Sequence, residues 1–159
     1  TFIEPTQQIR SLGVKLKHSV NKTLIKNKSL ILVDDSLVRG TTSVKIIKML
    51  YEFGAKEVHL RIASPPIKYP DYYGVDTPTE EELLASKLDL EGMRKFINAT
   101  TLQFLSIEGL YKSMGIEKRN SSYPQFTDHC FTGEYPVEPV DANDKNFKDD
   151  QLSFLSSKF

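Results

Sequence analysis

The sequence predicts an α/β fold in which a parallel sheet is flanked by helices. A run of apolar residues, Leu30 to Val33, stops at two carboxylates, and helical spacing begins after a polar loop. Two further apolar strands follow, each next to a segment with helical spacing. Strands that alternate with helices form right-handed parallel units, and 159 residues suffice for one domain with a real core.

The first predicted strand is the run Leu30 to Val33. Its branched residues Ile31 and Val33 are typical of a strand that is buried on both faces, with helices packed against the sheet. Apolar residues at helical spacing then predict a helix from about Thr42 to Phe53. Gly54 is a natural residue to end that helix.

The second predicted strand alternates apolar residues with His59 and Arg61, so one of its faces is less buried. A lone histidine inside a strand is more often structural than a titrating group. A long loop follows and carries three tyrosines, Tyr69, Tyr72 and Tyr73. They either form a flat apolar wall that closes one side of a ligand crevice or pack under the loop.

The rest of the chain completes the alternation of helices and strands. Thr79 and Glu82 have the spacing of a capping box at the start of a short helix. The segment beyond Glu117 is polar and rich in turns, which predicts an irregular C-terminal tail, and its apolar residues beyond 141 indicate a terminal helix. The elements expected in between are a helix at 90–97, a strand around 102–105 and a helix at 107–114.

The composition excludes several classes of protein. Lys plus Arg and Asp plus Glu both number 21, so the formal net charge is zero and no nucleic-acid partner is indicated. No apolar run approaches the roughly 20 residues of a membrane span, so no membrane partner is expected. The single cysteine, Cys130, rules out an internal disulfide framework and favours a cytoplasmic location.

The polar loop between the first strand and its helix is the candidate ligand site. Ligands of open α/β sheets bind beyond the carboxyl ends of the strands, where Asp34 and Asp35 are expected. Gly40 lets the backbone approach a ligand, and the N–H groups and hydroxyls of residues 41–43 can hold an anion. Two acids beside an anion cradle suit a sugar phosphate, whose vicinal hydroxyls bind carboxylates directly or through a divalent cation. The plain alternative is a strand end followed by a helix cap.

The segment Leu32 to Ser43 resembles the phosphoribosylpyrophosphate (PRPP) motif of the type I phosphoribosyltransferases. Within them the chain is similar to the glutamine PRPP amidotransferase (amidophosphoribosyltransferase) family. The resemblance covers residue 1 to about Val137 and implies a partial type I phosphoribosyltransferase fold. Its other matching segments, in the family's order, are TFIEPTQQ at 1–8, PPI at 65–67, YGVD at 73–76, ELLA at 82–85 and FTGEYP at 131–136.

The resemblance implies a reaction and assigns roles to the loop. Asp34 and Asp35 would be the catalytic acids, bind the ribose and hold Mg²⁺, and would offset positive charge at the anomeric carbon. The reaction joins glutamine-derived ammonia to PRPP and gives 5-phosphoribosylamine, pyrophosphate and glutamate in purine synthesis. The implied substrate-binding residues, with the 5-phosphate at the last five, are Asp34, Asp35, Ser36, Arg39, Gly40, Thr41, Thr42 and Ser43.

The same resemblance predicts the organisation of the chain. Residues 1–28 would be the remainder of a lid loop over PRPP and a leading helix, residues 29–116 a partial phosphoribosyltransferase core and residues 117–159 a C-terminal extension. Nothing matches the family's glutaminase domain or pyrophosphate loop, so the chain alone is expected to be inactive. Inhibition by purine nucleotides and a homo-oligomeric state are further expectations from the family.

Cys130 is relevant to a second cofactor of the family, an iron-sulphur cluster. Some amidotransferases of this kind carry an iron-sulphur cluster on cysteines at positions that correspond here to Asp71, Pro124, Thr127 and Cys130. One thiolate cannot hold a cluster that requires about four. We therefore expect no iron-sulphur cluster and interpret Cys130 as a small buried apolar residue.

Two other functions remain open at the level of sequence. A response-regulator receiver domain also places Asp-Asp-Ser after a first strand, but it needs a phosphoacceptor Asp at the end of a later strand and a Lys-Pro pair. Asp76 lies in a loop bounded by prolines, and no Lys-Pro pair occurs. A phosphoribosyltransferase relative that senses PRPP or a nucleotide without catalysis would keep the same loop.

Overall fold

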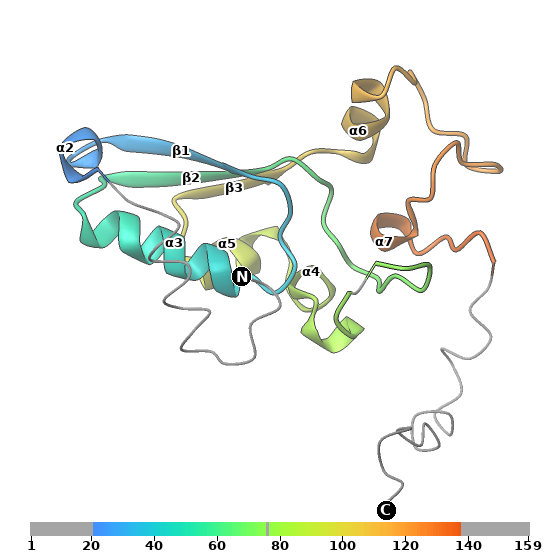
Figure 1. Ribbon diagram of the computed structural model, residues 1–159, viewed down its shortest axis with the longest axis horizontal. Coiled ribbons are helices and arrows are strands. Elements are labelled where there is room, and N and C mark those ends of the chain that lie inside the picture. The colour runs from blue at the N-terminus through green and yellow to red at the C-terminus, as the bar shows by residue number, and fades with distance from the viewer. Residues whose placement is uncertain (1–20, 76, 138–159) are drawn as a thin grey trace, which may run out of the picture.

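The computed structural model describes residues 21–75 and 77–137. Its centre is a three-stranded parallel sheet in the order β1-β2-β3 (Figure 1). Helices lie between successive strands, so the predicted parallel α/β arrangement is confirmed. The elements of this part are β1 (Ser29–Asp34), α3 (Thr41–Glu52), β2 (Glu57–Ile62), η1 (Glu80–Glu82), α4 (Leu84–Lys87), α5 (Leu90–Ile97) and β3 (Thr101–Phe104), with the short α2 (Lys22–Ile25) before them.

The core lies between the sheet and two helices. α3 and α5 cover the same face of the sheet (Figure 1). Side chains of a strand alternate between its two faces, so every second residue of β2 points toward these helices. The three residues that do so, Val58, Leu60 and Ile62, are at most 3% exposed. The buried core comprises Val58, Leu60 and Ile62 of β2 together with Leu37, Ile47, Leu84, Ala85, Met93, Ile97, Ala99 and Leu102.

The opposite face of the sheet is covered by none of the described residues. Ile31 and Val33 of β1 are 71% and 68% exposed, and Val33 lies in register with Arg61 of β2. The prediction that the first strand is buried on both faces is therefore wrong for the described part of the chain. An apolar run shows that a strand suits burial, but burial also requires a neighbour, and α3 and α5 both pack on the other face.

His59 has the structural role expected of a histidine within a strand. Its Nδ1 lies 2.9 Å from the Thr101 hydroxyl on β3, and its Nε2 lies 3.0 Å from the Ser29 hydroxyl on β1. The ring thus links three neighbouring strands on the uncovered face of the sheet.

The helix predicted at 90–97 is observed with the same bounds, and its ends are well defined. The Asp89 carboxylate accepts a hydrogen bond from the Gly92 N–H at 2.7 Å, and Asn98 ends the helix in the left-handed conformation. The capping box predicted from Thr79 and Glu82 is wrong. Thr79 makes no side-chain cap, and Glu82 turns instead to Arg39, because an arginine brought close by the fold offers a charged partner.

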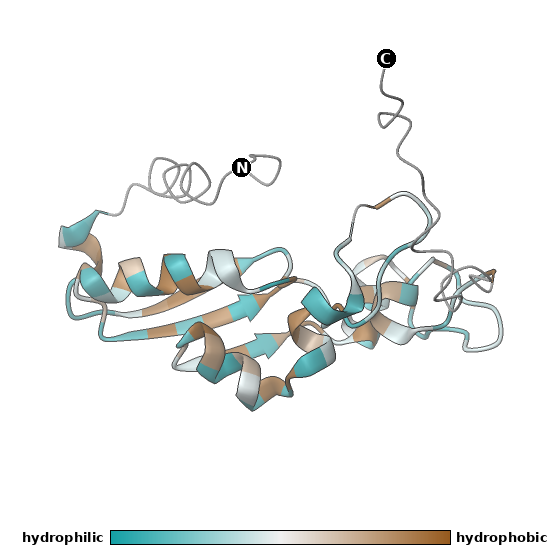
Figure 2. Ribbon diagram, turned by 90° about the horizontal axis from the view of Figure 1, so that it is seen from below, coloured by the Kyte–Doolittle hydropathy of each residue, from teal (hydrophilic) through white to brown (hydrophobic). Residues whose placement is uncertain are grey.

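A second group of elements lies at one end of the sheet, as Figures 1 and 2 both show. It contains α6 (Ile107–Ser113), α7 (His129–Thr132) and the loop of residues 63–79. The Arg119 guanidinium donates hydrogen bonds to the buried carboxylate of Asp128. It also donates to the Glu134 carboxylate at 2.6 Å. Apart from α7, residues 117–137 form no helix or strand, which agrees with the predicted irregular tail.

Several expectations fall on residues that the structure does not describe. Most of the lid and leading helix at 1–28, the terminal helix beyond 141 and Asp76 lie outside the described residues. None of the helices in the described part of the chain is long and apolar enough to cross a membrane.

Candidate functional site

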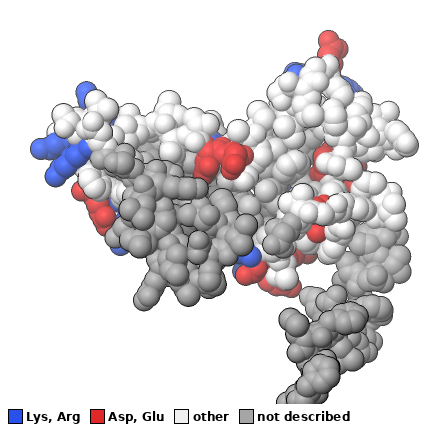
Figure 3. Space-filling view, viewed as in Figure 1, with Lys and Arg blue, Asp and Glu red and all other residues white. Residues whose placement is uncertain are grey.

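The two acids of the candidate loop lie at the carboxyl end of β1. Asp34 is the last residue of the strand and is half-buried, whereas Asp35 is exposed. The Asp35 N–H donates to Asp34 Oδ1, and the Ser36 hydroxyl donates to Asp35 Oδ1, both at 3.1 Å. Within residues 21–75 and 77–137, neither carboxylate forms an ion pair with a basic side chain. Figure 3 shows acidic side chains gathered over the region where β1 ends.

The start of α3 offers unsatisfied backbone donors. Its N-cap is Gly40, which has no side chain to cap the helix. The first hydrogen bond of the helix runs from the Val44 N–H to the Gly40 carbonyl at 2.9 Å, so the N–H groups of residues 41–43 have no acceptor within the helix. The helix dipole adds partial positive charge at this end. The helix start can therefore bind an anion.

Close packing fixes this loop in place. Leu37 is 2% exposed and belongs to the core, and the Leu84 N–H donates to the Val38 carbonyl at 2.8 Å. Gly40 has φ +75°, and a Cβ on it would lie 2.9 Å from Leu84 Cδ2 and 3.1 Å from Phe96 Cε1. The left-handed backbone therefore favours glycine here, and a larger residue would also require the Leu84 side chain and the Phe96 ring to shift.

The remaining predicted ligand residues differ in how exposed they are to solvent. Thr41 is exposed and Thr42 is half-buried, whereas Ser43 is only 3% exposed on the core side of α3. Arg39 pairs with Glu82 at 2.9 Å. Sequence analysis missed Glu82 as a partner of this loop, since nothing in the pattern links positions 43 residues apart.

The tyrosines of the 63–79 loop pack against the C-terminal segment. The Tyr73 ring meets the His129 ring edge-on with centroids 5.0 Å apart, and Tyr72 lies 5.5 Å from Tyr135. A Cβ on Gly133 would lie 2.9 Å from the Tyr69 ring. These contacts agree with the alternative in which the tyrosines pack within the protein, here against the C-terminal segment.

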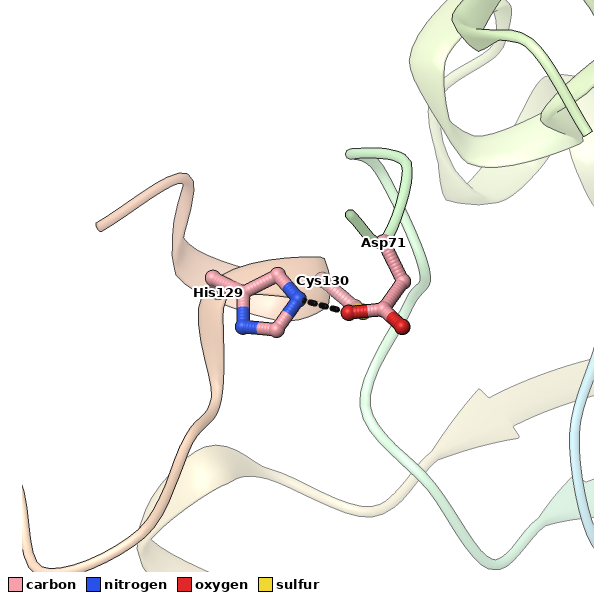
Figure 4. A group of neighbouring side chains, drawn as sticks. All are labelled: Asp71, His129 and Cys130. Atoms are coloured by element: carbon pink, nitrogen blue, oxygen red, sulfur yellow. Dashed lines mark hydrogen bonds and ion pairs between the residues drawn. The ribbon is translucent and has the colours of Figure 1, made fainter. Parts of the chain in front are cut away.

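A second polar cluster consists of Asp71, His129 and Cys130 (Figure 4). The side chains of Asp71 and His129 are 3% and 5% exposed, and His129 Nε2 forms a hydrogen bond and ion pair with Asp71 Oδ1. Among the described residues, His129 Nδ1 is buried without a hydrogen-bond partner. Cys130 is half-buried and faces these polar groups, so its interpretation as a buried apolar residue is only partly correct.

The local environment shifts the acidity of two members of this cluster. Burial raises the pKa of Asp71, but hydrogen bonds from the Val75 N–H and from His129 lower it more, so the pKa lies below its ordinary value. Burial, and then the negative charge of Asp71, raise the pKa of the Cys130 thiol. The resemblance aligns Asp71 and Cys130 with two positions of the family's iron-sulphur cluster, but it did not predict His129, which is the residue next to Cys130.

The strand ends argue against a receiver domain. β2 and β3 are followed by Ala63 and Leu105, so neither of these later strands ends at an acid. The receiver alternative is therefore wrong for the part of the chain that the structure describes.

Comparison with known proteins identifies similar sequences and structures. No protein-family model matches the chain. An amidophosphoribosyltransferase of Rhizobium etli is 57% identical over 158 residues, which cover 99% of this chain and 32% of that protein. The chloroplastic amidophosphoribosyltransferase 1 of Arabidopsis thaliana is 49% identical over 156 residues, covering 96% of this chain and 27% of that protein.

A solved structure agrees with these sequence matches. The glutamine PRPP amidotransferase of B. subtilis complexed with ADP and GMP is 49% identical and superposes with a TM-score of 0.70, covering 86% of this chain and 30% of that chain. The chain thus spans 27–32% of the length of the relatives compared with it.

Proposed function

Because the chain belongs to the amidophosphoribosyltransferase family, we propose that it is the C-terminal part of the PRPP-binding domain of such an enzyme. The whole protein would transfer glutamine-derived ammonia to PRPP and release pyrophosphate and glutamate, the step that forms 5-phosphoribosylamine for purine synthesis. The observation that carries this proposal is the pair Asp34 and Asp35, free of basic partners in the described part of the chain, beside the uncapped start of α3.

The charges of the loop determine how PRPP would lie in it. Carboxylates repel a phosphate but accept hydrogen bonds from hydroxyls, so the ribose hydroxyls belong at Asp34 and Asp35. The 5-phosphate belongs at the start of α3, where the backbone N–H groups of residues 41–43 lack acceptors within the helix and Thr41 and Thr42 are at least partly exposed. Ser43, which is buried, would contribute its N–H group and not its hydroxyl.

The acids also suit the chemistry of the transfer. Positive charge develops at the anomeric carbon as pyrophosphate leaves, and a carboxylate fixed beside it lowers the energy of that state. The carboxylate oxygens of Asp34 and Asp35 are the hard ligands that Mg²⁺ prefers, so these residues would hold it. When bound, Mg²⁺ would offset the negative charge of the pyrophosphate. The Arg39 guanidinium is paired with the Glu82 carboxylate. To bind the phosphate it would either keep this ion pair and use its other N–H groups or break the pair.

Further partners of the whole protein follow from its relatives. The B. subtilis relative was solved with ADP and GMP, and we propose that purine nucleotides inhibit the present protein too. We also propose a homo-oligomer and a cytoplasmic location, while the A. thaliana relative is chloroplastic. The described loop contacts only the ribose and the phosphate in this proposal, so we expect the 159-residue chain alone to be inactive.

Replacing Asp35 tests this function in the full-length protein. Asp35→Asn keeps the size of the side chain but removes its charge, so PRPP-dependent release of glutamate and pyrophosphate should fall on the order of 100-fold. Glu52→Gln is the matched control, because Glu52 is an exposed acid at the other end of α3. Unchanged turnover of Asp35→Asn would contradict the role of the acid pair. PRPP binding without turnover in the unmodified protein would favour a non-catalytic sensor instead.

A further inference from the structure

Asp71 of the 63–79 loop and His129 and Cys130 of α7 bring three different metal-ligating groups to one point (Figure 4). We propose that they bind a single divalent transition-metal ion of the zinc type. The ligands would be Asp71 Oδ1, His129 Nε2 and the Cys130 thiolate, and a water molecule would complete a four-coordinate site. This inference does not depend on the proposed function, since it includes no residue of the 34–43 loop.

The spacing of the three groups suits one ion. Their ligand atoms all lie within 4.8 Å of one another. Around a tetrahedral zinc ion with bonds of about 2.0–2.3 Å, neighbouring ligand atoms lie roughly 3.3–3.8 Å apart. Binding would therefore draw the thiolate in by at most about 1 Å and separate the carboxylate from the imidazole, which now share a hydrogen bond. Side-chain rotations achieve movements of this size without a change of fold.

The backbone around the cluster is already held in place. The Val75 N–H donates to Asp71 Oδ2 at 2.6 Å, which leaves Oδ1 facing His129, and the Asp71 N–H donates to the Thr77 hydroxyl at 2.6 Å. The Cys130 carbonyl accepts the Lys68 and Tyr69 N–H groups at 2.9 and 3.1 Å. Two segments 58 residues apart in sequence are thus joined next to the ligands before any ion binds.

The surroundings bury two of the three ligand side chains, while Cys130 is half-buried. The side chains of Asp71 and His129 are nearly fully buried, and the rings of Tyr73 and Tyr135 each lie with their centroids 5.0 Å from that of His129. Within the described residues the imidazole has polar contacts on its Nε2 side alone. Burying polar groups is costly unless they are paired, and a cation at this point would pair all three.

The chemistry of the ligands selects the metal. Imidazole and thiolate ligands favour zinc-type ions, whereas Mg²⁺ prefers oxygen ligands alone. A single thiolate does not supply the cysteines that an iron-sulphur cluster needs. An ion here would fasten the 63–79 loop to the C-terminal segment, so its expected role is structural.

Metal analysis of the full-length protein tests the site. The protein is purified without chelators after growth with zinc, and its metals and acid-labile sulphide are measured. We expect about one zinc per chain. Apoprotein titrated with Co²⁺ should develop a thiolate-to-cobalt charge-transfer band in the near ultraviolet. Cys130→Ser and His129→Gln should weaken Co²⁺ binding by more than the roughly 10- to 100-fold that loss of a supporting hydrogen bond costs.

A control variant and the unmodified protein keep the test decisive. His59→Gln replaces a partly buried histidine that belongs to a different hydrogen-bond network, so it should retain the metal. Absence of both bound zinc and the cobalt band in the unmodified protein would overturn the proposal, whether or not the variants fold. Iron with stoichiometric sulphide, or a cobalt band retained in Cys130→Ser, would also overturn it.

Discussion

Replacing Gly40 by alanine should loosen the start of α3 through two separable effects. Gly40 has φ +75°, and an alanine there is strained by roughly 1–2 kcal/mol. Its Cβ would also lie 2.9 Å from Leu84 Cδ2 and 3.1 Å from Phe96 Cε1, and overpacking of this kind costs about 1–3 kcal/mol. Together the two effects predict a loss of about 2–5 kcal/mol in the free energy of opening α3.

Gly115 separates strain from crowding. It has φ +81°, but a Cβ on it would meet no atom within 4 Å. Gly115→Ala should therefore cost only the conformational strain of roughly 1–2 kcal/mol, felt at the end of α6. The difference between the two variants measures the contact of the loop with α4 and α5.

Hydrogen exchange on the full-length protein measures both changes. Peptides covering α3 in Gly40→Ala should exchange faster by at least about 30-fold, because each 1.4 kcal/mol is a factor of ten. Peptides covering α6 in Gly115→Ala should change by roughly 5- to 30-fold. Equal effects in the two variants would refute the close packing of Gly40. A raised KM for PRPP in Gly40→Ala alone would in addition link the helix start to substrate binding.

Two further predictions concern α5. Asp89→Ala removes the side chain that accepts the Gly92 N–H at 2.7 Å and should cost about 1 kcal/mol in the opening of α5, measured by hydrogen exchange, whereas Asp89→Ser should restore most of it. The hydrogen bond and charge of Arg94 lower the pKa of Glu91 from 4.5 to about 2. Because the folded-state pKa is depressed, the contribution of this pair is present above pH 4.5 and is lost as the pH falls through about 2. A carboxyl-carbon NMR titration should find Glu91 still ionised at about pH 3, and Arg94→Met should return its midpoint toward 4.5; an unshifted midpoint in the native protein would contradict the pairing.

The parts of the fold that local patterns determine were predicted from the sequence. The helix at 90–97 was found with correct bounds because Asp89 and Asn98 mark its ends within the chain itself. The exposure of Ile31 and Val33 was not predicted, since it depends on where α3 and α5 pack and not on the strand. The failure of the capping box at Thr79 has the same cause, because Arg39 competes for Glu82 only once the chain has folded.

The same distinction applies to the functional residues: those that are neighbours in sequence could be predicted, and those brought together by folding could not. The continuous stretch 34–43 could be predicted, because its acids, its glycine and its helix start are neighbours in sequence. The cluster of Asp71 with His129 could not, because its members lie 58 residues apart. Only the alignment of Asp71 and Cys130 with cluster positions of the family pointed to it, and that alignment gave no sign of the histidine.

From the uncovered sheet face we also expect a tendency of this protein to self-associate. Ile31 and Val33 project from β1, which is the outer strand of the described sheet and pairs only with β2. Exposed branched residues beside a free strand edge favour adhesion between copies. Any sample in which this face stays bare should precipitate as its concentration rises, and charged replacements at positions 31 and 33 would keep such a sample in solution without touching the ligand loop.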